Sequence, residues 1–560
     1  MKQTAKVKAV SAGDMSPGRL TASEKRATEP LMRAIWSIQA LRPQLPLVFP
    51  TDATVPPSAK ARYRSQYCYP GPEALLDADR LAVMKPFEVS LRLIDFSPLE
   101  NVLAQHYKTG HKGQVPFHPV SMFLALLLRR ELNLSWRALA DLLAGDHGAG
   151  WRGLLGFQDQ DTPSASGLRY FFAQVGPTFF AELCQRFMDL LLGANLCSQH
   201  STCPGDPPDQ GVSITQDGML HPARNSSVCQ LATADCYQPV PHNGKRPCRA
   251  RANRHEGCAC DTSACRERCR RASSLDAEAR FIHYHGHNRY PRGEAESNTT
   301  GKERGIDVFG YRSIADRVLD DRFGISWTIR SVLCPANTDE RAVFVEAFNQ
   351  LRQRFPDLEI GEWIDDAGVG YGDCLDVLWE ARVLRMVDIR ADPSDSNPDA
   401  WLSRGYDAQG HPLCPHGYRL RPNGYDAKRR RSKWVCRQAC RRKPRREGEA
   451  VCPVQGCPYL DGRRPIGYVL NVSRTLPDGS NRLAREIPYG SPEWEARYGR
   501  RNHSESRNGQ LQGMGLKRMR SYGLERNTKE VQMADFIINL RTMGRLLKEA
   551  SHPPAAVPGG

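Results

Sequence analysis

The sequence lacks the features that mark membrane-spanning and secreted proteins. Its longest apolar run, residues 122–128, is far shorter than the roughly 20 residues that a helix needs to cross a bilayer. The N-terminal segment MKQTAKVKAVSAGDMSPGRL is basic but has no apolar core followed by a small-residue cleavage site, so it does not resemble a secretory signal. We therefore expect a cytoplasmic protein with no membrane partner.

Acidic residues are fewer than basic residues in this chain. The 560 residues include 78 Lys and Arg against 62 Asp and Glu, a formal net charge of +16, which favours polyanions and above all nucleic acid as partners. No Ser, His and Asp spacing typical of nucleophilic catalysis appears, so metal-dependent chemistry remains the open route for an enzyme. The length predicts roughly two to four domains with room for a sizeable core.

Helical patterning dominates one part of the chain. After a stretch with scattered Pro, Ala and Ser, apolar residues recur at three-and-four spacing from about residue 86 to 196. Two of the expected helices, WRALADLLAG and GLRYFFAQV, form either a helix-turn-helix or part of an ordinary helical bundle. Their expected N-caps are Ser135 for the first and Thr162, Ser164 or Ser166 for the second.

Strands and helices alternate after residue 205. Strands are predicted at GVSITQD, ARFIHYH, FGYRSIADRVL, ISWTIRSVL, LEIGEWIDD and LRMVDIRA, with amphipathic helices at TDERAVFVEAFNQLRQRF and GYGDCLDVLWEARV. This rhythm predicts a mixed α/β layer. A Cys-, Arg- and Pro-rich segment interrupts it from about 392 to 488, and a long helical region is expected from Pro492 to about 548.

Two aspartates follow apolar, strand-like runs. Asp217 precedes Gly218, and Asp366 precedes a small-residue segment, so each on its own is more often a turn or cap residue. Carboxylates at strand ends are nevertheless what a two-metal phosphodiester site needs. Asp365 competes with Asp366, since strand alternation lets only one of them face a given site.

A third acid lies on the late helical region. Its start is indicated by Ser491 as N-cap and Pro492 at the first position. At about 100° per residue, a narrow stripe on this helix combines an aromatic ring, a cation, a carboxylate and an amide. The stripe consists of Tyr498, Arg501, Glu505 and Gln512.

Together these residues resemble the DDE transposases of bacterial insertion sequences, which have a ribonuclease H-like catalytic domain. The family places one Asp on the first strand, one after the fourth strand and a Glu on a late helix within a Tyr, Arg, Glu, Lys pattern. Tyr498, Arg501 and Glu505 match that pattern, whereas Gln512 stands where the family has Lys and Lys517 lies nearby out of register. The match of IDDAGVGY to the second-Asp motif selects Asp366 over Asp365.

The resemblance implies a fold and a reaction. The fold is an α/β ribonuclease H-like mixed sheet flanked by helices, with an N-terminal all-helical domain and a Cys-rich insertion. Asp217 would bridge two Mg²⁺ or Mn²⁺ ions, Asp366 would bind one and Glu505 the other, while Tyr498, Arg501, Gln512 and Lys517 would contact DNA. The enzyme would cut at terminal inverted repeats and join the 3′ ends to target DNA, as a homodimer on double-stranded DNA.

The resemblance also organises the chain into domains. The expected ranges are a loosely ordered leader (1–85), a helical DNA-binding domain (86–200), the first part of the catalytic core (205–391), a Cys- and Arg-rich, zinc-binding insertion with strands (392–488), a C-terminal helical part of the core (489–548) and a disordered tail (549–560).

Cysteine pairs in the insertion predict structural Zn²⁺. Cys436 and Cys440, then Cys452 and Cys457, have spacings close to those of zinc knuckles, and in a reducing cytosol such thiols are more often ligands than disulfides. Cys414 with His416 is a further pair just upstream, and the ligand set stays open between them. A second Cys-rich cluster lies between 248 and 269.

Two other functions stay open from the sequence. Gln512 in place of Lys leaves room for a zinc-stabilised DNA-binding protein that derives from a transposase and does not cut. A stand-alone metal-dependent DNA nuclease would share the three acids but release the cut ends.

Overall fold

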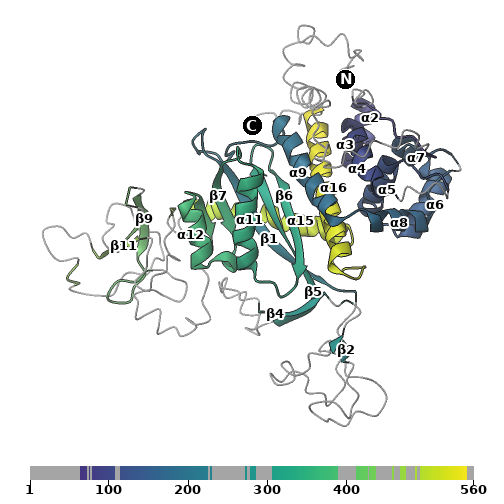
Figure 1. Ribbon diagram of the computed structural model, residues 1–560. Coiled ribbons are helices and arrows are strands. Elements are labelled where there is room, and N and C mark those ends of the chain that lie inside the picture. The colour runs from purple at the N-terminus through teal and green to yellow at the C-terminus, as the bar shows by residue number, and fades with distance from the viewer. Residues whose placement is uncertain are drawn as a thin grey trace, which may run out of the picture.

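The computed structural model consists of N-terminal helices and a mixed sheet on either side of one long C-terminal helix, α16 (Leu524–Ser551) (Figure 1). The described residues are 63–71, 75, 78–107, 114–159, 161–224, 228–229, 272–273, 276, 278–285, 305–388, 412–426, 428–429, 431–436, 457–459, 467–473, 486–487 and 492–551. The expected tail, the second Cys-rich cluster and most of the leader lie outside them.

The N-terminal helices are α2 (Ala78–Val83), α3 (Pro86–Leu93), α4 (Glu100–Ala104), α5 (Pro119–Glu131), α6 (Trp136–Ala144), α7 (Ala149–Leu155), α8 (Ala165–Gln174) and α9 (Pro177–Gly193). Ser135 caps α6 by accepting a hydrogen bond from the Ala138 amide at 3.1 Å, as predicted. Of the three candidate caps for α8, Ser164 is the one that accepts, from Gly167 at 3.2 Å.

The bundle alternative describes these helices better than the helix-turn-helix one. Helix α7 and a 3-10 turn (Asp146–Gly148) separate α6 from α8, whereas a helix-turn-helix joins its two helices by a turn of about three or four residues. Apolar faces of α3, α5 and α9 pack on α16, and they share one hydrophobic core with the sheet.

The described part of the expected leader contains buried apolar residues. Tyr67, Leu75 and Leu81 are buried in the main core, so these three residues contribute to packing. Single apolar residues in a polar, Pro-containing stretch have no helical or strand period, and their burial depends on the helices that surround them.

The sheet contains β1 (Val212–Pro222), β4 (Arg280–His285), β5 (Gly305–Asp320), β6 (Ile325–Pro335), β7 (Ile360–Asp365) and β8 (Leu384–Val387). The order is β6, β5, β1, β7, β8, and β4 pairs with the first part of β5 beside β6. Strand β5 pairs antiparallel with β1 on one side and with β6 on the other, whereas β7 runs parallel to β1 and β8 parallel to β7. All these strands, and the mixed α/β class, were predicted.

Helices cover both faces of this sheet. On one face, Phe344 and Phe348 of α11 (Glu340–Arg354) pack against Trp363 of β7 with ring centroids 5.1 and 5.7 Å apart, and α12 (Gly372–Glu380) lies beside α11. On the other face, α15 (Asn502–Gly513) contacts β1, β5 and β6. The side chains of β1 alternate between these two layers.

The long helical region expected from Pro492 is interrupted. It consists of α14 (Pro492–Tyr498), a 3-10 turn (Gly499–Arg501), α15, a non-helical connection at residues 514–523, and α16. Gly515 and Gly523 adopt left-handed φ angles of 79° and 87°, which side chains with a Cβ rarely adopt. The glycines therefore end α15 and allow the chain to turn into α16.

The described part of the Cys-rich insertion forms a small antiparallel sheet of β9 (Arg421–Asp426), β10 (Arg431–Val435) and β11 (Val469–Ser473). Trp434 and Val472 of this sheet share a second hydrophobic cluster with Met386 of β8 and Trp494 of α14. The described part of the insertion thus packs at the β8 edge of the large sheet, next to α14 at the start of the C-terminal helices.

Candidate active site

One face of β1 meets the C-terminal helices. Ser213, Thr215 and Asp217 alternate along the strand, and the Thr215 hydroxyl lies 3.3 Å from that of Ser504 on α15. Asp217 lies inside the strand and not after it, because pairing with β5 continues to Pro222 opposite Gly310. The Asp-Gly pair at 217–218 therefore forms no turn.

The two adjacent aspartates at the end of β7 have different surroundings. Asp365 is buried, and its two oxygens accept hydrogen bonds from the Trp363 indole at 3.3 Å and from the Asp366 amide at 2.8 Å. Burial, followed by the charge of Asp366, raises the pKa of Asp365 well above its usual value. Asp366 is more exposed and accepts from the Gly368 amide at 2.6 Å, an approach that a Cβ at 368 would obstruct. Asp366 is thus the more accessible carboxylate of the two.

Arg501 brings the three predicted acids together. Its Nη2 lies 3.3 Å from Asp217 Oδ1 and 3.5 Å from Asp366 Oδ2, and its Nη1 lies 3.2 Å from Glu505 Oε1. These four side chains come from β1, the end of β7, the 3-10 turn and α15. We call them the acid centre.

Asn508 completes the surroundings of Asp217. Its Nδ2 donates to Asp217 Oδ2 at 2.6 Å from one turn beyond Glu505 on α15. The prediction from the sequence did not include Asn508. Its position three residues after Glu505 on the same helix is the signal that would have indicated it.

Like charges crowd the acid centre. Burial raises the pKa of Asp217, Arg501 lowers it, and the carboxylates of Asp366 and Glu505 raise it again. Burial disfavours the charged Arg501, but the nearby Asp217 and Asp366 outweigh that effect and raise its pKa. Three carboxylates share one guanidinium, so the centre has a formal charge of −2 and favours additional cations.

The donor chemistry of the acid centre fits a hard divalent cation. Carboxylate and amide oxygens are the ligands that Mg²⁺ and Mn²⁺ prefer, and Asp217, Asp366 and Glu505 provide three carboxylates. Their oxygens gather around the Arg501 guanidinium, and no group of three His, Cys, Asp or Glu side chains in the described residues is arranged to hold an ion by itself.

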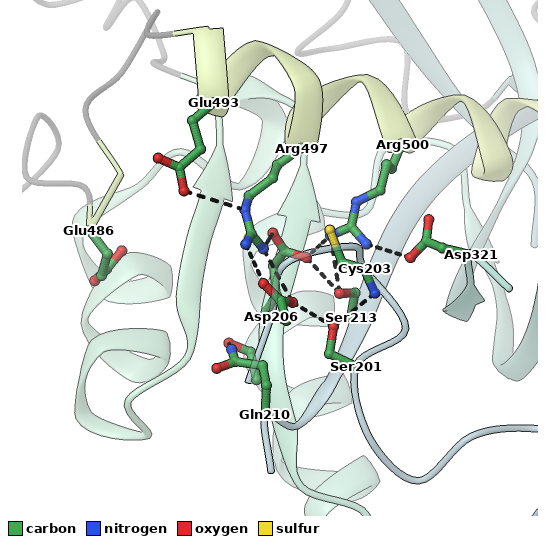
Figure 2. Close-up of polar contacts among 12 residues, drawn as sticks. Ser201, Cys203, Asp206, Gln210, Ser213, Asp321, Glu486, Glu493, Arg497 and Arg500 are labelled. Carbon is green, nitrogen blue, oxygen red and sulfur yellow. Dashed lines mark hydrogen bonds and ion pairs between the residues drawn. The ribbon is translucent and has the colours of Figure 1, made fainter. Parts of the chain in front are cut away.

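A buried charge network anchors the start of the C-terminal helices, as Figure 2 shows. Glu362 of β7 forms ion pairs with Arg500, and with Arg497 at 3.3 Å, and it accepts from the Ser213 hydroxyl at 2.6 Å. Arg497 also pairs with Asp206, and Arg500 with Asp321 at 2.8 Å. The network holds the helical segment that carries Arg501 against β1 and β7.

This network was missed from the sequence, although Glu362 carries a signal. It is a charged residue flanked by Gly361 and Trp363 in β7, whose six residues are all buried, and a buried carboxylate requires cationic or hydrogen-bonding partners. A second buried pair fixes α15 on α16: Arg507 Nε lies 2.6 Å from Asp535 Oδ1 and its Nη2 lies 2.8 Å from Oδ2.

The other residues predicted to contact DNA are dispersed. Tyr498 stacks on Trp494 with ring centroids 4.4 Å apart and packs against the second hydrophobic cluster. Gln512 and Lys517 are exposed, but Gln512 lies in the last turn of α15 and Lys517 in the connection after it. The 3-10 turn and the end of α15 therefore leave only Arg501 and Glu505 of the stripe in the acid centre.

The predicted zinc ligands are only partly within the described residues. Cys436 directly follows β10, and its amide donates to the Tyr468 carbonyl at 2.9 Å, while Cys457 is buried. Cys440 and Cys452 lie outside the described residues. Upstream, Cys414 packs against the same second hydrophobic cluster as Cys436.

The comparisons with known proteins concern the N-terminal helices. Among the described helices, none is long and apolar enough to cross a membrane. No curated protein matches the chain. Residues 77–174, which comprise α2 to α8, match the family model described as Transposase domain (DUF772). This chain therefore carries a transposase domain, followed in sequence by the sheet and helices that form the acid centre.

Proposed function

We propose that the protein is a DDE transposase that cuts DNA at the terminal inverted repeats of an insertion sequence and joins the 3′ ends to target DNA. The observation that carries the proposal is the convergence of Asp217, Asp366 and Glu505 on Arg501. These residues are distant in sequence, and a transposase domain precedes them in the same chain.

The sheet supports a ribonuclease H-like core. Three antiparallel strands are followed by two parallel ones, in the order β6, β5, β1, β7, β8. Asp217 lies on the first strand and Asp366 directly after β7, which is the fourth strand of this sheet in chain order when β4, paired only with the first part of β5, is left out. These positions support the proposal.

Each residue of the acid centre has a proposed role. Asp217, Asp366 and Glu505 hold two Mg²⁺ or Mn²⁺ ions, and Asn508 orients Asp217 through its 2.6 Å hydrogen bond. Such ions activate the attacking oxygen and stabilise the leaving oxygen in phosphoryl transfer. Arg501 balances the carboxylates and then pairs with a DNA phosphate, a partner that the planar guanidinium binds well.

The test uses the full chain and labelled duplexes that end in the cognate inverted repeats, with target DNA and Mg²⁺ or Mn²⁺. We expect cut and joined products with the unaltered protein and neither product with Asp217→Ala, Asp366→Ala or Glu505→Ala. Products that are cut but never joined would favour the stand-alone nuclease. Full strand transfer by Asp366→Ala, together with loss of strand transfer in Asp365→Ala, would show that Asp365 is the second catalytic carboxylate in place of Asp366.

Structural zinc at Cys436, Cys440, Cys452 and Cys457 is a separate proposal. It is supported by the paired spacing and by the position of Cys436 at the end of β10, from which the chain enters the Cys-rich segment. Metal analysis of the purified protein is expected to give about one Zn²⁺ per chain, as for a four-ligand site. Protein that contains no zinc and has an unchanged melting temperature after chelation would contradict it.

Dimerisation on double-stranded DNA is proposed because the reaction joins two ends. Sedimentation of the protein with and without a terminal-repeat duplex is expected to show two chains per pair of ends. A single chain that joins both ends would contradict this proposal.

A further inference from the structure

A cavity of about 350 Å³ lies between the transposase domain and the connection that follows α15. Helices α5, α6 and α8 contribute one side of it, and residues 516–530 contribute the other. Figure 1 shows the start of α16 beside these helices. Six arginines line the cavity, and we call it the arginine pocket: Arg129, Arg130, Arg169, Arg224, Arg520 and Arg526.

The buried part of the pocket has more cations than anions. Arg129 and Arg130 of α5 both pair with Glu530 of α16, Arg130 at 3.5 Å, and all three residues are buried. The Nε atoms of both arginines are buried without a hydrogen-bond partner. Two guanidiniums against one carboxylate leave a formal charge of +1 that the protein does not balance, and buried charges require partners.

The ionisation of these groups agrees with that imbalance. Burial lowers the pKa of Arg130 to about 10, although the Glu530 carboxylate opposes this. Burial alone would raise the pKa of Glu530, but Arg129 and Arg130 outweigh it and hold that pKa below the usual value. At neutral pH Arg130 and Glu530 are therefore both charged.

The outer part of the pocket adds positive charge and aromatic surface. Arg169, Arg224 and Arg520 are exposed, so the six arginines and Glu530, the one acid among the described lining residues, give a formal charge of +5. The Arg129 guanidinium lies 4.0 Å from the centre of the Trp136 ring, and Arg224 lies 5.0 Å from that of Tyr522. A groove of fixed guanidiniums beside aromatic rings suits a nucleic-acid backbone.

The pocket is connected to the acid centre through rigid contacts. The Met519 amide donates to the Pro222 carbonyl at 2.9 Å, at the end of β1. The buried His221 ring lies 2.6 Å from the Leu516 carbonyl and 2.8 Å from the Ser313 hydroxyl. Five residue steps along β1 lead from Asp217 to Pro222, which corresponds to roughly 17 Å, or a few nucleotides along a DNA strand.

We propose that the arginine pocket binds backbone phosphates of double-stranded DNA a few nucleotides from the acid centre. This rests on the proposed function for the identity of the DNA as the element's end, but the binding step itself needs neither metal nor cleavage. The transposase domain and the C-terminal helices then both contribute guanidiniums to one duplex. The exposed arginines contact the phosphates. The net positive charge of buried Arg129 and Arg130 with Glu530 adds to their electrostatic attraction for DNA.

The test measures the affinity of the full chain for a labelled duplex, by fluorescence anisotropy in EDTA at several salt concentrations. The double variant Arg169→Gln, Arg520→Gln replaces two exposed side chains and leaves the buried pair intact. We expect affinity to fall at least ~10-fold near 0.1 M salt, and the slope of log K against log salt to decrease by about 2. The matched control is Arg137→Gln, Arg352→Gln, two exposed arginines outside the pocket, which are expected to change the affinity and the slope much less.

The outcomes separate this proposal from the proposed function. Unchanged affinity and slope in the pocket variant, with cleavage intact in the unaltered protein, would overturn the pocket and leave the transposase assignment standing. The expected loss of affinity in a protein that never cuts would support the pocket and overturn the catalytic proposal. Inorganic phosphate that raises the melting temperature of the unaltered protein but not of the pocket variant, without any difference in duplex affinity, would identify a free-phosphate site and overturn the DNA proposal.

Discussion

The acid centre and the arginine pocket lie at the two ends of one segment of chain, residues 501–530, and they have opposite charge. Three carboxylates surround one guanidinium in the acid centre, whereas six guanidiniums surround one carboxylate in the arginine pocket. Arg501 in the acid centre and Glu530 in the arginine pocket each pair with residues from other helices or strands. The first site favours cations and the second favours anions, so together they suit a metal-dependent reaction on a polyanion.

The difference also concerns accessibility. Asp366 and Glu505 are partly exposed, while Arg129, Arg130 and Glu530 are buried. An exposed cluster exchanges its partner readily, since water stabilises its charges while the partner is absent. A buried cluster loses more when a partner is removed. Substitutions in the acid centre should therefore affect chemistry, and substitutions inside the arginine pocket should affect stability.

The largest expected effect separates cleavage from binding. Asp217→Asn should reduce metal-dependent cleavage by at least about 10³-fold, because metal ions contribute several kcal/mol to the transition state. Its duplex affinity in EDTA should persist, because the arginine pocket is intact. Asp209→Asn, an exposed acid before β1, is the matched control for cleavage. Loss of both duplex binding and cleavage in Asp217→Asn would contradict the assignment of cleavage to the acid centre and of binding to the arginine pocket.

The second effect concerns Glu530, the carboxylate of the arginine pocket. Glu530→Gln leaves two buried guanidiniums without a carboxylate and should lower the free energy of unfolding by about 4 kcal/mol. Urea unfolding measures this, and added sulfate should restore more stability to the variant than to the unaltered protein. Glu525→Gln, an exposed acid on the same helix, should cost less than about 0.5 kcal/mol.

The stability that Glu530 contributes is expected to decrease at acidic pH. The folded pKa of Glu530 lies below its usual value of 4.5, so its contribution is complete above that pH and is lost as the pH falls through the folded pKa. The difference between the unaltered protein and Glu530→Gln should therefore shrink in acid. A difference that stays constant down to low pH would show that Glu530 acts by packing and not by charge.

A third effect tests the anchor of the acid centre. Glu362→Gln removes the buried carboxylate shared by Arg497 and Arg500 and should lower the free energy of unfolding by about 3 kcal/mol. Cleavage should fall in the folded variant, because the segment that carries Arg501 loses its attachment to β7. Glu493→Gln is the matched control: this exposed acid lies 3.9 Å from the same Arg497, so stability should hardly change. Equal stability of the two variants would contradict the role of Glu362.

The smallest expected effect concerns the link between the two sites. Burial lowers the pKa of His221 to about 4 from 6.5, so the unfolded chain takes up a proton first and stability is lost as the pH falls from 6.5 towards 4. At pH 5.5 the loss relative to pH 8 should be roughly 1.5 kcal/mol. His221→Asn should flatten this part of the profile in urea unfolding. An equally steep profile in the variant would assign the slope to another group.

Periodicity alone predicted most of the fold. Strands β1 and β4 to β8, helices α11 and α12, and the caps of α6 and α8 follow from local patterns, because alternation and helical spacing are properties of neighbouring residues. The breaks after Tyr498 and Gly513 were not predicted. Left-handed Gly515 follows the second break, and the segment around the first is held by Glu362, which pairs with Arg497 and Arg500 from a distant part of the sequence.

The candidate site was predictable in composition but not in assembly. Residue type and spacing indicated Asp217, Glu505, Arg501 and one of Asp365 and Asp366, and the family resemblance selected Asp366. The distinct surroundings of Asp365 and Asp366 became visible only where β7 ends beside the Arg501 turn. Tyr498 shared the predicted stripe, yet it packs on Trp494, because a 3-10 turn changes the phase of the helix.

The sequence by itself determined the excess of positive charge, the alternation of strands and helices, and the residue types available for chemistry, since each of these is local or additive. Only the tertiary structure decided which charges meet. The Glu362 network, the acid centre and the arginine pocket all join elements more than 100 residues apart. Charges interact through space and depend on burial, and neither quantity can be read from the order of residues along the chain.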